Sequence, residues 1–196
     1  MISLLLGIAA FALYILYDIN RFTRKLRFAH AFFLLGTVLL GIATALDVWQ
    51  AWKAGAFSGA LDAVLLIGAV LFFAALIYSL FFALPFKETY TEQEGNDRVY
   101  SGGVYALCRH PGILCFFGMY LLLGLAALPS GMIVRSLVFS FLNLLYAWFQ
   151  DCVTFPKTFC DYSDYQKCVP FLIPTQHSIS MARKTLFSTQ DEEAIL

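Results

Sequence analysis

Three consecutive residues in the second half of the chain, Arg109-His110-Pro111, place a fixed positive charge and an imidazole at the start of an apolar run. The glycine-rich segment Ser101-Gly102-Gly103-Val104-Tyr105 precedes them. Proline is favoured at the first helical position, so we predict a helix that begins at Pro111, with free N–H groups beside His110. Such a terminus attracts anions, and glycine lets a ligand approach the backbone. Anchoring of the helix at lipid head groups is the alternative interpretation.

A second group of residues lies downstream and contains two tyrosines and two prolines. It reads Tyr162-x-x-Tyr165-x-x-x-Val169-Pro170 and ends in Phe171-Leu172-Ile173-Pro174. Residues three apart share a helix face, so the rings of Tyr162 and Tyr165 are suited to stack on an adenine or to attract a cation. Interfacial anchoring is the alternative role for both tyrosines.

Together the two groups resemble the isoprenylcysteine carboxyl methyltransferase and phospholipid methyltransferase superfamily, over residues 98–174. The resemblance implies S-adenosylmethionine as the cofactor and a lipid-like or prenylated acceptor with a carboxylate or an amine. In that scheme Arg109 orients an acceptor carboxylate or phosphate, and Asp151 supplies counter-charge or accepts a proton. The residues expected at the cofactor are Gly103, Tyr105, His110, Pro111, Tyr162 and Tyr165.

The chain departs from the superfamily pattern at several positions. Asp151 is the one carboxylate in the region of a Glu-Glu pair, and Val104, Ala106 and Ile113 stand where the family has Pro, Arg and Tyr. These departures leave a non-catalytic membrane protein with the same fold as an alternative. A nicotinamide-dependent reductase of the sterol type, which resembles the superfamily in its C-terminal region, is a further one.

The composition is that of a membrane protein. Of the 196 residues, 60% are hydrophobic, 17% are aromatic and only 13% are charged, and the mean hydropathy is +0.74. Because hydrocarbon cannot satisfy backbone polar groups, the long apolar runs must form helices. We predict an all-α, polytopic membrane protein with about five transmembrane helices and a cytosolic C-terminal helical segment. The runs are 2–17, 29–48, 59–84, 111–128 and 132–149.

Basic residues set the predicted orientation. They gather in the first loop (Arg21, Arg24, Lys25, Arg27), in the third loop (Lys87, Arg98, Arg109) and in the tail (Lys157, Lys167, Arg183, Lys184). With five spans and the positive-inside rule, the N-terminus lies outside and both motif elements are cytosolic. The net charge is formally zero, and no nucleic-acid partner is expected.

The short turn Pro129-Ser130-Gly131 predicts that the last two spans form an antiparallel hairpin. This hairpin would bring Arg109, before one helix, close to Gln150-Asp151, at the end of the other. We predict one methyltransferase-like domain over residues 1–174 and a polar, partly disordered tail over residues 175–196.

Other polar residues are expected to have no catalytic or ligand-binding role. Asp47 and Asp62 are expected to be exposed near the outer ends of their spans, and Arg135 is expected to reach outward to the membrane surface. The five cysteines are expected to be free thiols. Because they form no C-x-x-C pair, no metal site is expected.

Overall fold

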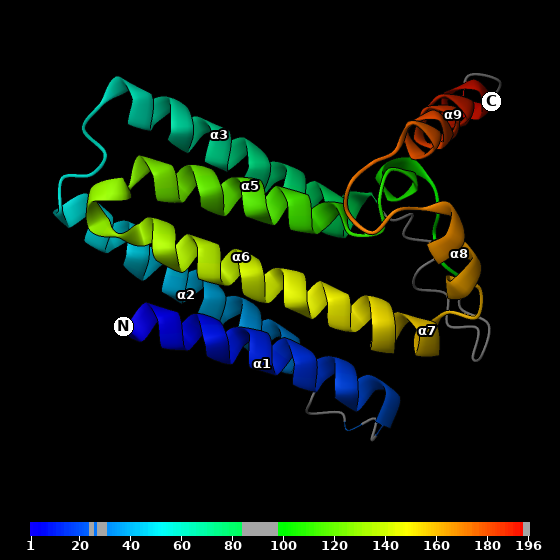
Figure 1. Cartoon of the computed structure of the whole chain (residues 1–196), viewed down its shortest axis with the longest axis horizontal. Coiled ribbons are helices and arrows are strands. Elements are labelled where there is room, and N and C mark those ends of the chain that lie inside the picture. The colour runs from blue at the N-terminus through cyan, green and yellow to red at the C-terminus, as the bar shows by residue number, and fades with distance from the viewer. Residues whose placement is uncertain (24–25, 27–30, 84–97, 194–196) are drawn as a thin grey trace. The chain divides into compact units, whose positions relative to one another are not determined.

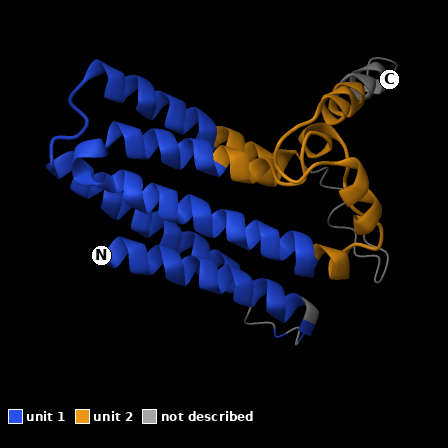
Figure 2. Ribbon diagram, viewed as in Figure 1, with its two compact units in different colours: residues 1–73, 116–154 blue, residues 74–115, 155–196 orange. Residues whose placement is uncertain are grey.

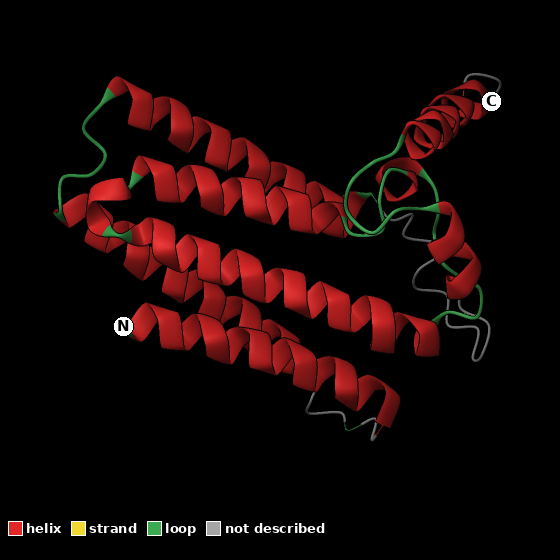
Figure 3. Cartoon of the chain, viewed as in Figure 1, coloured by secondary structure: helices red, strands yellow, loops and turns green. Residues whose placement is uncertain are grey.

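The computed structural model describes residues 1–23, 26, 31–83 and 98–193, and every regular element within these ranges is a helix (Figure 3). The predicted all-α class is therefore confirmed. The predictions that rest on Arg24, Lys25, Arg27 and Lys87 lie outside the described residues.

Four helical segments within the described ranges are long and apolar enough to cross a membrane (Figure 1). They are α1 (Ile2–Thr23), α2 (Ala31–Lys53), α3 (Ala60–Ile77) with the π-helical turn η2 (Tyr78–Phe82), and the segment Met132–Thr158 that contains α6 (Met132–Phe149). A further apolar helix, α5 (Pro111–Ala126), is shorter, with 16 residues. The chain is a helical membrane protein with several candidate spans.

The chain divides into two compact units (Figure 2). Unit 1 comprises Met1–Phe73 and Phe116–Thr154, and unit 2 comprises Ala74–Cys115 and Phe155–Leu196. The boundary that the sequence predicts, after residue 174, falls inside unit 2. Unit 1 contains most of the membrane helices, whereas unit 2 contains both motif elements.

Small residues let the helices of unit 1 approach closely. A Cβ atom on Gly124 of α5 would lie 2.9 Å from the Cα atom of Ile133 on α6. On α1, a Cβ atom at Gly7 would overlap the ring of Phe139, and on α2 one at Gly36 would lie 3.0 Å from the carbonyl oxygen of Ala10. Close backbone contact of this kind is how helices associate where lipid removes the hydrophobic driving force.

The hairpin between α5 and α6 is present, as the sequence predicts. A 3₁₀ turn, η4 (Leu128–Ser130), joins the helices, and Gly131 follows it in the left-handed conformation with φ at 68°. Ser130 Oγ accepts a hydrogen bond from the N–H of Met132 at 3.3 Å and donates one to the carbonyl oxygen of Ala127 at 2.7 Å. Glycine adopts this φ without steric cost, which explains why the turn is so short.

The sequence predicts that the last apolar helix ends at Gln150-Asp151. In the structure the helix extends further. It continues through a π-helical turn, η5 (Gln150–Thr154), into α7 (Phe155–Thr158). The physical reason lies at Pro156, which has no N–H to donate to the preceding turn. A π-helical turn before it widens the hydrogen-bond pattern, so the helix continues past the proline.

Within the predicted tail, residues 176–193 form a helix, α9 (Gln176–Glu193). Thr175 and Ser178 cap its start reciprocally: the N–H of Thr175 donates to Ser178 Oγ at 2.9 Å, and the N–H of Ser178 donates to Thr175 Oγ1 at 3.2 Å. Ser178 and Ala182, one turn apart, are buried against the 3₁₀ helix η3 (Gly103–Ala106). Capping and this small buried face order a segment whose composition is polar.

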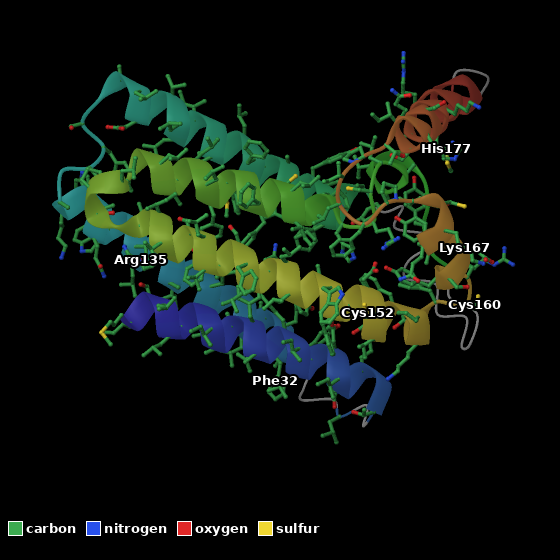
Figure 4. All side chains as sticks on the ribbon, viewed as in Figure 1. Phe32, Arg135, Cys152, Cys160, Lys167 and His177 are labelled. Atoms are coloured by element: carbon green, nitrogen blue, oxygen red, sulfur yellow. The ribbon has the colours of Figure 1, made fainter. Side chains whose placement is uncertain are left out.

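Asp47 and Arg135 correct a further expectation. Asp47 is 1% exposed, and Arg135 Nε lies 2.6 Å from its Oδ1, so the two form an ion pair between α2 and α6 of unit 1. Arg135 is labelled in Figure 4. Asp47 is therefore not exposed, and the guanidinium of Arg135 is directed to the Asp47 carboxylate. Pairing lowers the cost of both charges inside an apolar bundle, which explains why they face each other.

Candidate functional site

Arg109 joins the two motif elements within unit 2. Its Nη1 donates hydrogen bonds to the carbonyl oxygens of Gln166 at 3.0 Å and Val169 at 2.8 Å, and its backbone N–H donates to Pro170 O at 2.9 Å. These carbonyls lie at the end of α8 (Tyr162–Cys168), where a positive charge is favoured. The two segments that carry the family resemblance therefore contact each other.

His110 and Pro111 begin the apolar helix α5. The helix starts at Pro111, which confirms the predicted start, and the carbonyl oxygen of His110 accepts the N–H of Ile113 at 3.1 Å. The imidazole is 7% exposed and stacks on Phe155, with ring centroids 5.8 Å apart and planes 14° apart. Phe171 contacts it edge-on at 4.9 Å. His110 is thus held between aromatic rings from two sides.

Tyr162 and Tyr165 share the buried face of α8, as their spacing predicts. They are 2% and 8% exposed, and their ring centroids are 5.9 Å apart. With Val169 they form a small core, against which Val99, Phe155 and Phe159 pack. The Tyr165 hydroxyl donates to the carbonyl oxygen of Tyr105 at 2.7 Å. The tyrosines therefore connect α8 to the glycine-rich segment.

Two further hydrogen bonds hold the glycine-rich segment. Tyr105 donates from its hydroxyl to the carbonyl oxygen of Ser79, in the π-helical turn η2, at 2.7 Å. Gly103 has φ at 58°, and its N–H donates to Thr185 Oγ1 of α9 at 3.1 Å. The small size of Gly102 makes room for the ring of Tyr100, because a Cβ atom there would lie 2.7 Å from the tyrosine hydroxyl.

Burial changes the acidity of two groups next to the motif. Desolvation raises the pKa of the Tyr105 hydroxyl to about 12, with a smaller contribution from the nearby Cys108. It also raises the pKa of the Cys108 thiol to about 11. Both groups are therefore neutral at physiological pH, and neither serves as an ionised nucleophile there.

Asp151 belongs to unit 1, where it is 5% exposed within the π-helical turn η5. Arg109 belongs to unit 2, so the predicted proximity of these two side chains stays a prediction. Among the described residues no group of three or more His, Cys, Asp or Glu side chains is arranged to hold a metal ion.

Sequence reasoning did not identify three residues of these networks. Ser79 and Thr185 hold the glycine-rich segment, and Asp18 of unit 1 is a buried acid that binds Gln150. Asp18 could have been identified from the sequence, because burying an acidic side chain near the end of an otherwise apolar run costs free energy and such residues are usually functional. Ser79 and Thr185 had none, because a single hydroxyl in a helix is common.

The arrangement in unit 2 combines a guanidinium, an imidazole and a helix N-terminus with a cluster of aromatic rings. The charged and polar groups suit a carboxylate, whereas the rings suit an aromatic or cationic ligand. No protein-family model, curated protein or solved structure matches this chain.

Proposed function

We propose that this protein is an integral membrane methyltransferase that uses S-adenosylmethionine and acts on the carboxylate or amine of a lipid-like or prenylated acceptor. One observation carries the proposal: Arg109 bonds directly to the end of the tyrosine-bearing helix α8. The residues with the spacing of the superfamily are thereby gathered at the start of an apolar helix. A lipid-borne acceptor would approach such a place from the bilayer.

The donor set of unit 2 fits the chemistry of this cofactor. The start of α5 and His110 would bind its carboxylate, and Gly103 and Tyr105 would contact the same molecule through the backbone. Tyr162 and Tyr165 would form an aromatic wall. When bound, the cofactor supplies an activated methyl group, and transfer to the acceptor oxygen or nitrogen leaves S-adenosylhomocysteine. The sulfonium is a good leaving group, so the chain mainly has to position the reactants and exclude water.

Arg109 and Asp151 have different parts in this scheme. Because Nη1 of Arg109 holds two carbonyl groups, Arg109 positions the tyrosine segment, in addition to the predicted attraction for an acceptor carboxylate or phosphate. Asp151 would supply counter-charge to the sulfonium or accept a proton from the acceptor. The orientation with both motif elements in the cytosol, where the cofactor is made available, is part of the same proposal.

A non-catalytic membrane protein is the second candidate, and a specific observation favours it. Polar groups of the motif make bonds that hold the fold: Tyr165 to Tyr105, Gly103 to Thr185, and Arg109 to α8. A chain that had lost methyl transfer would still need these contacts for stability.

Detergent-purified protein incubated with methyl-labelled S-adenosylmethionine and fractionated membrane lipids tests both candidates. An enzyme labels one lipid fraction and forms S-adenosylhomocysteine in equal amount. Binding without either product supports the non-catalytic candidate, and absence of binding contradicts the proposed cofactor. His110→Ala is expected to weaken cofactor binding at least about tenfold. His177→Ala, at an exposed histidine of α9, is the matched control and should bind like the wild type.

A further inference from the structure

A buried carboxylate in unit 1 is separate from the motif residues. Asp18 stands three residues before the end of the apolar segment Ile2–Arg21 and is 3% exposed. Its Oδ2 accepts a hydrogen bond from Gln150 Nε2 at 3.0 Å, and the same Nε2 donates to the hydroxyl of Tyr146 at 2.8 Å. The hydroxyl of Thr154 lies nearby. An ionisable side chain in a membrane span is costly, so it indicates a functional site unless a partner explains it.

The immediate surroundings of Asp18 are polar but neutral. Among the described residues, the basic group whose charge acts on it is Arg21, which is exposed one turn further along α1. A carboxylate offers about four lone-pair positions, and a charged N–H donor binds roughly twice as strongly as a neutral one. An ammonium group is therefore a better partner for this carboxylate than the hydroxyl groups that now surround it.

Aromatic rings beside Asp18 favour an organic cation over a metal ion. Tyr14 stacks on Tyr146, with ring centroids 5.5 Å apart, and Tyr17 is close enough to Tyr146 to interact with it electrostatically. Aromatic rings attract ammonium cations, whereas hard metal ions require about six oxygen ligands.

The position of Asp18 along its helix indicates where the cation comes from. Asp18 lies three residues from the end of the candidate span Ile2–Arg21, and the ends of a membrane-spanning helix lie where hydrocarbon gives way to lipid head groups. The facing Gln150 begins the π-helical turn η5, and such turns occur frequently at functional sites. Asp18 and Arg21 then offer a negative and a positive group one turn apart on α1.

We propose that Asp18 and Arg21 form a head-group site for a zwitterionic phospholipid that carries a primary ammonium. The ammonium binds the Asp18 carboxylate and displaces one of the neutral polar groups beside it, since only 3% of Asp18 is exposed. The phosphate binds Arg21. Because the site lies wholly in unit 1, the inference does not depend on methyl transfer.

The test is a lipid competition on the full-length protein. Wild-type protein is reconstituted in nanodiscs that contain equal amounts of phosphatidylethanolamine and phosphatidylglycerol. The protein is then released from the nanodiscs, and native mass spectrometry identifies the lipids that it retains. We expect phosphatidylethanolamine to be retained about tenfold over phosphatidylglycerol. In Asp18→Asn this preference should vanish. Equal retention of both lipids by the wild type, or an unchanged preference in Asp18→Asn, would overturn the proposal.

Two further variants separate the proposed contacts from a folding defect. Arg21→Gln, at an exposed position, should reduce retention of both lipids alike, because both carry a phosphate; unaltered retention counts against the phosphate contact. Asp62→Asn is the matched control, since this partly exposed acid accepts a hydrogen bond from Gly59 N that asparagine can keep. Displacement of the lipid by millimolar ethanolamine in water would overturn the assignment to a lipid.

Discussion

At the scale of single residues, Arg109 shows how one side chain unites segments far apart in the sequence. Its guanidinium reaches the carbonyls of Gln166 and Val169, 57 and 60 positions away. A planar group with several N–H donors can hold two carbonyl oxygens at once, and a lysine cannot do so with the same geometry. Arg109 therefore contributes to the fold of unit 2 as well as to its chemistry.

Arg109→Ala is expected to destabilise unit 2 by about 2 to 4 kcal/mol, because it removes two charge-assisted hydrogen bonds. Arg109→Lys should recover part of this loss. Amide hydrogen exchange of α8 measures the effect. Arg183→Ala, at an exposed arginine of α9, is the control and should leave α8 protection unchanged. Equal protection of α8 in Arg109→Ala and the wild type contradicts the assigned contact.

The ion pair between Asp47 and Arg135 makes a second residue-scale prediction. Asp47→Asn or Arg135→Gln leaves a charge without its partner inside unit 1, which should cost about 3 to 5 kcal/mol. The double variant removes both charges and should regain most of that stability. Thermal unfolding in detergent of the two single variants and the double variant gives the coupling energy. Additive losses would show that the two side chains do not interact.

The raised pKa of Cys108 predicts a pH-dependent reactivity. Burial raises the pKa of the Cys108 thiol from 9.0 to about 11 and shields its sulfur from the solvent. At pH 8 Cys108 should therefore react with N-ethylmaleimide far more slowly than Cys160, which is exposed. The stabilisation that this burial provides is complete below pH 9, because neither state ionises there. It is lost as the pH rises from 9 towards 11, since the unfolded chain then loses its proton first. Peptide mass spectrometry after timed labelling measures both rates, and equal rates would contradict the burial of Cys108.

At the scale of elements, capping decides whether the C-terminal segment is a helix. Thr175→Ala removes the hydroxyl that accepts the N–H of Ser178, and we expect α9 to lose about 1 kcal/mol of helix stability. Hydrogen exchange of the α9 amides should then become several-fold faster. Ser180→Ala, at an exposed position in the same helix, should leave exchange unchanged. Faster exchange in both variants would contradict a specific cap.

At the scale of the whole molecule, the shortness of α5 determines the topology. Its 16 residues extend for only about 24 Å, against a hydrocarbon thickness of about 30 Å. If α5 spans the membrane, the chain crosses five times and its termini lie on opposite sides, with the N-terminus outside. Reporter fusions at each terminus in membrane vesicles test this expectation. Termini on the same side would contradict five crossings and the proposed cytosolic orientation.

Much of the fold could be predicted from the sequence because one physical constraint dominates. In hydrocarbon the backbone must satisfy its own hydrogen bonds, so long apolar runs become helices regardless of detail. Pro111 as the start of α5 and Gly131 as the end of the hairpin turn followed from local backbone preferences. The shared face of Tyr162 and Tyr165 followed from helix periodicity.

Two features of the structure that local patterns did not predict depend on residues distant in the sequence. Asp47 is buried because Arg135 faces it, 88 residues away by number, and no local pattern reveals that pairing. The tail is helical because its small buried face meets η3. The third difference is local. The last span continues past Asp151 because a π-helical turn accommodates Pro156, and the hydropathy of the sequence does not predict such a turn.

The sequence by itself determined that the chain is a helical membrane protein and which residues have the types and spacing for chemistry, since these depend on apolar length and on local backbone preference. Only the tertiary structure decided that Arg109 holds the end of α8, that Asp47 pairs with Arg135, and that Asp18 is buried beside Gln150. The reason is physical: a charge selects its partner by distance and surrounding dielectric, and both are properties of the folded chain.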